Sequence, residues 1–180
     1  MSRPFHDAVA AVTGARSLLF VPGDRPDLFA KASATAADLV IIDLEDAVAA
    51  SAKETALECA LEWLASGHDA LVRVNAPGTT WHSGELAALA ATRATVMIPK
   101  AESASALAAA HAVVGARIVA LVETASGLRE ADQVCSAPGV VRIALGNVDL
   151  AVELGVDSSS HRALAYARGR LVAASAAAAL

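Results

Sequence analysis

The stretch that decides the fold reads IVALVET and runs from Ile118 to Thr124. It is an apolar segment of β-branched and small residues that ends in a single carboxylate, Glu123. A second acid, Asp149, stands 26 residues further on and follows another apolar run, residues 140–145. The carboxyl ends of parallel strands are where α/β enzymes gather catalytic groups and ligands. The pair therefore predicts an enzyme with a Mg²⁺ site.

The composition limits the classes of protein that fit. The chain has 180 residues, and we expect a single domain, residues 1–180. Its net charge of −5 and the lack of a basic block argue against nucleic acid as a partner. No apolar run reaches about 18 residues, so we expect no membrane span, and the start does not resemble a secretion signal. The isolated Cys59 and Cys135 favour a reducing compartment, so we expect the cytoplasm.

Strand and helix patterns alternate along the chain. Strands are expected at 17–21, 39–44, 70–74, 95–98, 117–123 and 140–145, and helices at 27–33, 53–66, 83–91, 103–114, 126–136 and 160–179. Nearly continuous apolar strands followed by helices indicate a parallel sheet covered by helices. The spacing is typical of a TIM-type (β/α) barrel, which has eight strands. About six of the eight βα units are present.

The C-terminal part of such a barrel is expected to be missing. Three arrangements then stay open: the sheet remains open, the chain is a fragment, or a partner supplies the remaining strands. A doubly wound open sheet is a further alternative, although no GxGxxG motif follows a strand to support dinucleotide binding.

Charged side chains also follow or interrupt the earlier strands. Arg73 lies within an apolar strand, and its planar guanidinium suits a substrate carboxylate. A structural salt bridge to Asp43 or Glu45 is the alternative. Lys100 is expected to make a salt bridge or a substrate contact. If the strands are parallel, these side chains converge with Glu123 on one face.

Glu123 and Asp149 are the expected Mg²⁺ ligands. Mg²⁺ is usually bound through one or two carboxylates together with water and substrate. The alternative for each acid is to cap or favour the start of the following helix. The recurrence of an acid after two strands favours ligation over capping.

Six short motifs occur along the chain in a fixed order. They read RSLLFVPGDRP from Arg16, DLEDAV from Asp43, VRVN from Val72, IPKAE from Ile98, LVETA from Leu121 and GNVDLA from Gly146. In this order they resemble the citrate lyase β-subunit-like group of the HpcH/HpaI aldolase superfamily, which includes malyl-CoA lyases. Any one motif is weak, whereas six in order at similar spacing are specific.

The resemblance implies a Mg²⁺-dependent carbon–carbon lyase. It would cleave a 3-hydroxy acyl thioester, of citryl-CoA or malyl-CoA type, to an α-keto acid and acyl-CoA. By motif position, Glu123 and Asp149 bind Mg²⁺ and Arg73 binds the keto-acid carboxylate, so these three form the catalytic set. Asp43 and Glu45 complete the substrate site in the outer shell of the metal.

The resemblance also implies partners and an assembly. Phe20, Arg25 and Lys31 would lie near the coenzyme A entrance, and a homo-oligomer, a trimer or hexamer, is expected. Members of the group continue beyond the position of Leu180. Two alternatives to an active lyase follow: an idle, truncated relative that keeps metal and keto-acid binding, or a structural subunit that completes a partner's barrel. The resemblance leaves the general base unassigned.

Overall fold

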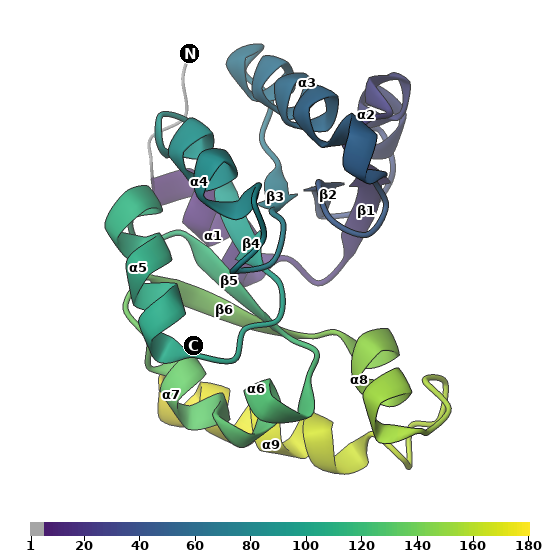
Figure 1. Cartoon of the computed structure of the whole chain (residues 1–180), viewed down its shortest axis with the longest axis vertical. Helices are drawn as coiled ribbons and strands as arrows, with labels where there is room; N and C mark the ends of the chain where they lie inside the picture. Colours follow the sequence, from purple (N-terminus) through teal and green to yellow (C-terminus); the bar gives the residue numbers. More distant parts are fainter. Residues whose placement is uncertain (1–5) are drawn as a thin grey trace. The chain divides into compact units, whose positions relative to one another are not determined.

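The structure, a computed structural model, describes residues 6–180 of the chain. The chain forms two compact units, one ending at Met97 and the other beginning at Ile98. In Figure 1 the colours of the first unit run from purple to teal and those of the second from teal to yellow. Parallel strands alternate with helices in both, so the predicted α/β class is confirmed. That residues 1–180 form one domain stays a prediction.

Four strands follow one another as parallel neighbours up to the end of the first unit. They are β1 (Leu18–Pro22), β2 (Leu39–Asp43), β3 (Leu71–Arg73) and β4 (Thr95–Ile98). Every residue of β2, β3 and β4 is buried, as expected for parallel strands covered on both faces. Asp43, the last residue of β2, is the register partner of Arg73, the last residue of β3. Parallel pairing thus places an acid beside a guanidinium.

The helices of the first unit are α1 (His6–Gly14), α2 (Pro26–Ser33), α3 (Lys53–Ala65) and α4 (His82–Ala90), with a 3-10 turn, η1 (Ala50–Ala52). Helix α2 begins with a proline, whose missing N–H costs nothing at that position. It contacts β1 and β2, and Figure 1 shows it beside β1. The ring of Phe29 in α2 meets that of Trp63 in α3 edge-on, with centroids 5.6 Å apart. An aromatic contact therefore links the two helices.

The second unit is built around two parallel strands, β5 (Ile118–Val122) and β6 (Val140–Leu145). The side chain of Ser103 caps the helix that precedes them by accepting a hydrogen bond from Ala106 N–H. The helices are α5 (Ala104–Val114), α6 (Ala125–Arg129), α7 (Ala131–Cys135), α8 (Asn147–Leu154) and α9 (Ala165–Ala177).

A small core joins the C-terminal helices to β6. Leu150 and Ala151 of α8 are buried with Leu164 and Ala167, and Leu145 packs against them. Helix α9 lies along α7 (Figure 1), where Arg170 forms a bidentate ion pair with Asp132 at 2.6 and 2.9 Å. This packing holds α8, which carries Asp149, close to the end of β6.

Two helix predictions were wrong in extent. The helix expected at 126–136 is two short helices, with Glu130 ending α6 and preceding α7. The helix expected from 160 begins only at Ala165. An additional helix, α8, follows β6 and ends at Gly155, which adopts the left-handed conformation that glycine accepts without strain.

The helices are short. The longest among the described residues, α3 and α9, have 13 residues each. Spanning a bilayer takes about 20 apolar residues. Within residues 6–180 no helix has the length and apolar character needed to cross a membrane.

Candidate functional site

The Arg73 cluster, which we define as Arg73, Asp43, Glu45 and Asp46, lies at the carboxyl ends of β2 and β3. Arg73 Nε donates to Asp43 Oδ1 at 2.7 Å and Nη2 donates to Asp43 Oδ2 at 2.6 Å. Its Nη1 lies 3.2 Å from Glu45 Oε2 and 3.3 Å from Asp46 Oδ2. This paired geometry is the strongest arrangement between a guanidinium and a carboxylate. The alternative considered for Arg73, a structural salt bridge to Asp43 or Glu45, is therefore present with both acids.

Asp43 also organises the loop that carries the other two acids. Its two carboxylate oxygens accept hydrogen bonds from the backbone N–H groups of Glu45, at 2.9 Å, and Ala47, at 3.1 Å. The same side chain thus orients the guanidinium and the loop. Because the loop is tied to Asp43, the position of Glu45 depends on it.

Electrostatics keep Arg73 charged in this buried position. Burial by itself lowers the pKa of Arg73, but the hydrogen bonds to Asp43 and the charges of the cluster acids outweigh it and raise the pKa above its ordinary value. The ring of Phe20, about half exposed, lies 5.0 Å from the guanidinium carbon in a cation–π contact. Arg73 is a permanent cation with one face covered by an aromatic ring.

A buried polar network supports the same loop, and the sequence did not predict it. Lys53 Nζ donates to the backbone oxygens of Leu44, at 2.7 Å, and Glu45, at 2.6 Å. Asn75 Nδ2 donates to the oxygen of Leu44 at 2.9 Å and to Glu85 Oε1 at 2.5 Å. Glu85 Oε2 accepts the N–H of Asn75 at 2.7 Å. Each member satisfies another, as buried polar groups require.

One feature of the sequence could have indicated this network. Lys53 is the first residue of α3, where a positive side chain opposes the helix dipole. A lysine in that position suggests another partner, and here the partners are the two loop carbonyls. Nothing in the spacing of Asn75 and Glu85 marks them as partners of each other.

Glu85 leads to a prediction about pH. It is 2% exposed, and burial raises the pKa of its carboxyl, although its hydrogen bonds to Asn75 oppose the rise. A group whose pKa is raised on folding contributes stability at low pH and loses it as pH rises through the folded pKa. The free energy of unfolding of the wild type, relative to Glu85→Gln, should therefore be larger at pH 5 than at pH 7. Urea unfolding of both proteins at the two pH values measures this difference, and a reversed slope would contradict the placement of Glu85.

In the second unit, Glu123 follows β5 directly and is 3% exposed. The backbone N–H of Lys100 donates to its Oε1 at 2.9 Å. Helix α6 is capped by Thr124, whose hydroxyl accepts from Gly127 N–H at 3.0 Å, and Glu153 accepts the N–H of Ala125 at 3.0 Å. The capping role considered for Glu123 is therefore filled by other side chains.

Asp149 approaches the same place from α8. It lies in the first turn of that helix rather than at the strand end, and its side chain is 42% exposed. Lys100 Nζ lies 3.9 Å from Glu123 Oε1 and 4.0 Å from Asp149 Oδ2. A single ammonium group thus stands near both carboxylates, which we call the Glu123–Asp149 pair.

The two carboxylates of this pair are oxygen donors of the kind that Mg²⁺ accepts. Within residues 6–180 no group of three or more His, Cys, Asp and Glu side chains is arranged to hold a metal ion. Structural zinc sites need four such ligands, whereas Mg²⁺ uses one or two carboxylates and keeps water or substrate oxygens. The Glu123–Asp149 pair matches the second requirement.

Gly146 makes room for the carboxylate of Glu123. A Cβ at this position would lie 2.5 Å from Glu123 Cβ and 2.6 Å from its Oε2. Gly146→Ala should therefore displace the carboxylate, destabilise the protein by about 1–3 kcal/mol and weaken Mg²⁺ binding about tenfold. Calorimetric Mg²⁺ titration and thermal unfolding measure both effects.

The matched control is Gly169→Ala in α9, where an added Cβ meets nothing within 4 Å. That change should leave Mg²⁺ binding as it is and raise helix stability slightly. Equal Mg²⁺ affinity in Gly146→Ala and wild type would show that the position of Glu123 does not govern metal binding.

The residues expected near coenzyme A lie in the first unit. Arg25 is exposed and pairs with Asp27 through Nε and Nη2, both at 2.9 Å. The hydrogen bond from Arg25 lowers the pKa of Asp27, and the charge of Lys31 lowers it further. Arg25, at the start of α2, and Lys31, in its last turn, thus both act on the exposed carboxylate of Asp27. Phe20 instead contacts Arg73.

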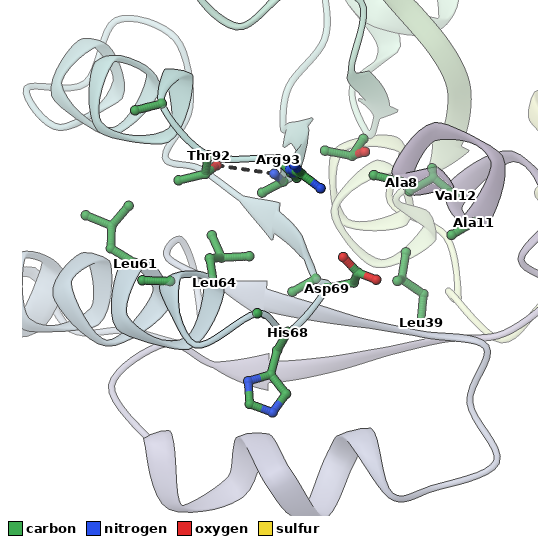
Figure 2. A pocket seen from close by; sticks show the side chains of 16 residues that line it. Ala8, Ala11, Val12, Leu39, Leu61, Leu64, His68, Asp69, Thr92 and Arg93 are labelled. Carbon is green, nitrogen blue, oxygen red and sulfur yellow. Dashed lines mark hydrogen bonds between the residues drawn. The ribbon is translucent and has the colours of Figure 1, made fainter. Parts of the chain in front are cut away.

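A cavity of about 790 Å³ lies at the opposite ends of the strands of the first unit. Its lining includes Leu39 and Thr95, the first residues of β2 and β4. Figure 2 shows Leu61 and Leu64 of α3 on one side and Val12 of α1 on the other. The Arg73 cluster lies at the carboxyl ends, so this mainly apolar cavity is separate from it.

Comparison with known proteins gives one consistent result. The sequence model of the HpcH/HpaI aldolase/citrate lyase family matches residues 16–180. A citrate lyase subunit beta-like protein of Mycobacterium tuberculosis is 44% identical over 146 residues, which cover 81% of this chain and 52% of that protein. A (3S)-malyl-CoA thioesterase of Cereibacter sphaeroides is 39% identical over 146 residues, covering 78% and 51%. The chain therefore spans about half the length of these curated relatives.

Solved structures agree with the sequence matches. The protein CitE of Mycobacterium tuberculosis, in complex with magnesium and acetoacetate, matches with a TM-score of 0.79 and 37% identity over 93% of this chain and 72% of that one. The same TM-score relates the chain to a citrate lyase beta subunit from that organism bound to oxaloacetate and magnesium, at 38% identity. Together with the six strands found within residues 6–180, these matches confirm the prediction of a TIM-type fold with about six βα units.

Proposed function

The chain belongs to the HpcH/HpaI aldolase/citrate lyase family. We propose that it acts as a Mg²⁺-dependent carbon–carbon lyase. Its substrate would be a 3-hydroxy acyl thioester of citryl-CoA or malyl-CoA type, and its products an α-keto acid and acyl-CoA. The proposal is supported by the solved relatives that hold magnesium with acetoacetate or oxaloacetate, one of them also with coenzyme A.

The observation that carries the proposal is the buried carboxylate of Glu123. Thr124 and Glu153 accept the backbone N–H groups at the start of α6, so Glu123 is not needed there. Gly146, directly after β6, leaves space for the carboxylate of Glu123. With Asp149 nearby, two carboxylates supply the protein part of a magnesium shell. These carboxylates would hold Mg²⁺, which would supply a Lewis acid for the keto-acid carbonyl and for the substrate alkoxide whose collapse to that carbonyl breaks the carbon–carbon bond.

The other residues would bind and orient the substrate. Arg73 presents a guanidinium whose orientation is set by two hydrogen bonds to Asp43, so little side-chain entropy is lost when it binds a carboxylate. Asp43 and Glu45 hold that guanidinium in position, and Asp43 also orders the loop that follows β2. We propose that they contribute to substrate binding in this indirect way. Lys100 holds Glu123 through its backbone N–H.

Recognition of coenzyme A would use the exposed face of α2. Arg25 and Lys31 carry positive charge there, and phosphate groups bind such side chains. The ring of Phe20 offers an apolar contact beside Arg73. We propose that these three residues lie along the coenzyme A path.

A thioesterase is the second candidate, because a (3S)-malyl-CoA thioesterase is 39% identical to this chain. Incubation of the purified protein with malyl-CoA and Mg²⁺ separates the candidates by their products. Glyoxylate and acetyl-CoA indicate a lyase, whereas malate and free coenzyme A indicate a thioesterase. Metal and keto-acid binding without either product set would identify an idle relative and contradict both.

The assembly and the compartment belong to the same proposal. We propose a homo-oligomer, a trimer or hexamer, and a mass by light scattering equal to one chain would contradict it. A barrel completed by a different protein would instead show as a mixed complex. Cys59 and Cys135 are both free thiols, which supports a reducing compartment such as the cytoplasm.

A further inference from the structure

Lys100 has a backbone conformation that residues with a side chain rarely adopt. Its φ is 47°, in the left-handed region, which is unfavourable for a residue with a Cβ. Strain of this kind persists only where the surrounding structure maintains it, and it concentrates at functional sites. Here the conformation points the N–H of Lys100 at Glu123 Oε1, 2.9 Å away.

The ammonium group of the same residue stands near both acids of the Glu123–Asp149 pair. Its distances are 3.9 Å to Glu123 Oε1 and 4.0 Å to Asp149 Oδ2. Lys100 therefore supplies a hydrogen-bond donor and a positive charge to the same carboxylate, and the positive charge alone to the second.

A buried carboxylate needs such compensation. Glu123 is 3% exposed, and a carboxylate removed from water is costly unless it is hydrogen-bonded and paired. A second carboxylate nearby adds like-charge repulsion. Without a metal ion, the ammonium of Lys100 is well placed to balance this local negative charge.

We propose that Lys100 is a resident counter-cation of the Glu123–Asp149 pair, which Mg²⁺ displaces when it binds; the inference rests on the proposed function. A divalent cation on both carboxylates and an ammonium about 4 Å from the same oxygens repel each other. The side chain of Lys100 is 42% exposed on a flexible stem, so the ammonium can move to solvent while its N–H remains on Glu123.

This exchange has two consequences. The metal-free protein keeps its two acids in place, because the ammonium offsets their repulsion. The apparent affinity for Mg²⁺ is lower than the acids alone would give, because each binding event must first separate the ammonium from them.

The test is Lys100→Met, which keeps an unbranched side chain and removes the charge. Calorimetric titration should show Mg²⁺ binding about five- to tenfold tighter than in wild type. Thermal unfolding of the metal-free variant should begin at a lower temperature than in wild type, and saturating Mg²⁺ should remove that difference. If the role of Lys100 were purely structural, its replacement by methionine would lower the unfolding temperature equally with and without Mg²⁺.

Three further variants make the result specific. Lys100→Gly also removes the charge and accepts a positive φ without strain, so it should bind Mg²⁺ more tightly even if Lys100→Met folds poorly. Lys100→Arg keeps the cation and should stay close to wild type. Arg168→Met removes an exposed positive charge from α9 in the same unit and should change the Mg²⁺ affinity little.

The outcomes separate this inference from the function on which it rests. If wild type binds Mg²⁺ while Lys100→Met and Lys100→Gly bind it equally or more weakly, the counter-cation role is wrong and the metal site stands. If neither wild type nor any Lys100 variant binds Mg²⁺, the proposed function fails and the inference fails with it.

Discussion

Replacement of Glu123 by alanine is expected to abolish detectable Mg²⁺ binding, with a loss of affinity above about 100-fold. Changes to groups that only support a metal ligand typically cost about 10–100-fold, so removal of a ligand should exceed that range. Glu123 is the buried member of the pair, whereas Asp149 is 42% exposed. Calorimetric titration of Mg²⁺ into wild type and variant measures the loss.

The control for this variant is Glu102→Ala, which removes an exposed carboxylate from the loop after Lys100. It should bind Mg²⁺ as wild type does, because it changes the net charge by the same amount without touching the pair. If Glu123→Ala binds Mg²⁺ as well as Glu102→Ala does, Glu123 is not a ligand and the site lies elsewhere.

Arg73→Met is expected to lose both stability and keto-acid binding. The guanidinium makes two hydrogen bonds to the buried Asp43 and lies 3.2 Å from the buried Glu45. Its removal leaves these carboxylates without their cation, which typically costs about 3–5 kcal/mol of unfolding free energy. Affinity for pyruvate or glyoxylate should fall at least about 30-fold, a free-energy change of about 2 kcal/mol.

Two measurements separate loss of binding from loss of folding in this variant. Mg²⁺ titration reports on the second unit and should give an affinity close to wild type if the protein is folded. Arg73→Lys keeps the charge but not the planar fork, so it should recover part of the stability and little of the keto-acid affinity. Wild-type keto-acid affinity in Arg73→Met would rule out the assignment of the substrate carboxylate to this residue.

The sequence predicted the strands better than the side-chain network. The runs at 95–98 and 140–145 match β4 and β6 without change, because short, mostly apolar segments next to proline or glycine leave little choice. The pairing of Asp43 with Arg73 was expected as one alternative, because an arginine within an apolar strand needs an acidic partner if it is buried. Helices were placed less well, since α8 has eight residues and a short amphipathic pattern.

Some parts of the candidate site were beyond prediction for physical reasons. The hydrogen bonds of Lys53, Asn75 and Glu85 join positions 8 to 31 residues apart, and three of them end on the backbone oxygens of Leu44 or Glu45. No periodicity links such positions. The positive φ of Lys100 could not be predicted from its residue type, because lysine rarely adopts that region of backbone conformation. Gly146 reads as an ordinary glycine until the carboxylate of Glu123 is seen to occupy the space beside it.

We propose that this chain binds an α-keto acid through a magnesium ion. Calorimetric titration of pyruvate or glyoxylate, with saturating Mg²⁺ and again with the metal removed by chelator, tests it most directly. We predict measurable binding with Mg²⁺ and at least a tenfold weaker affinity, of order 1.4 kcal/mol or more, without it. Equal keto-acid affinity in the two titrations, or no binding in either, would contradict the claim.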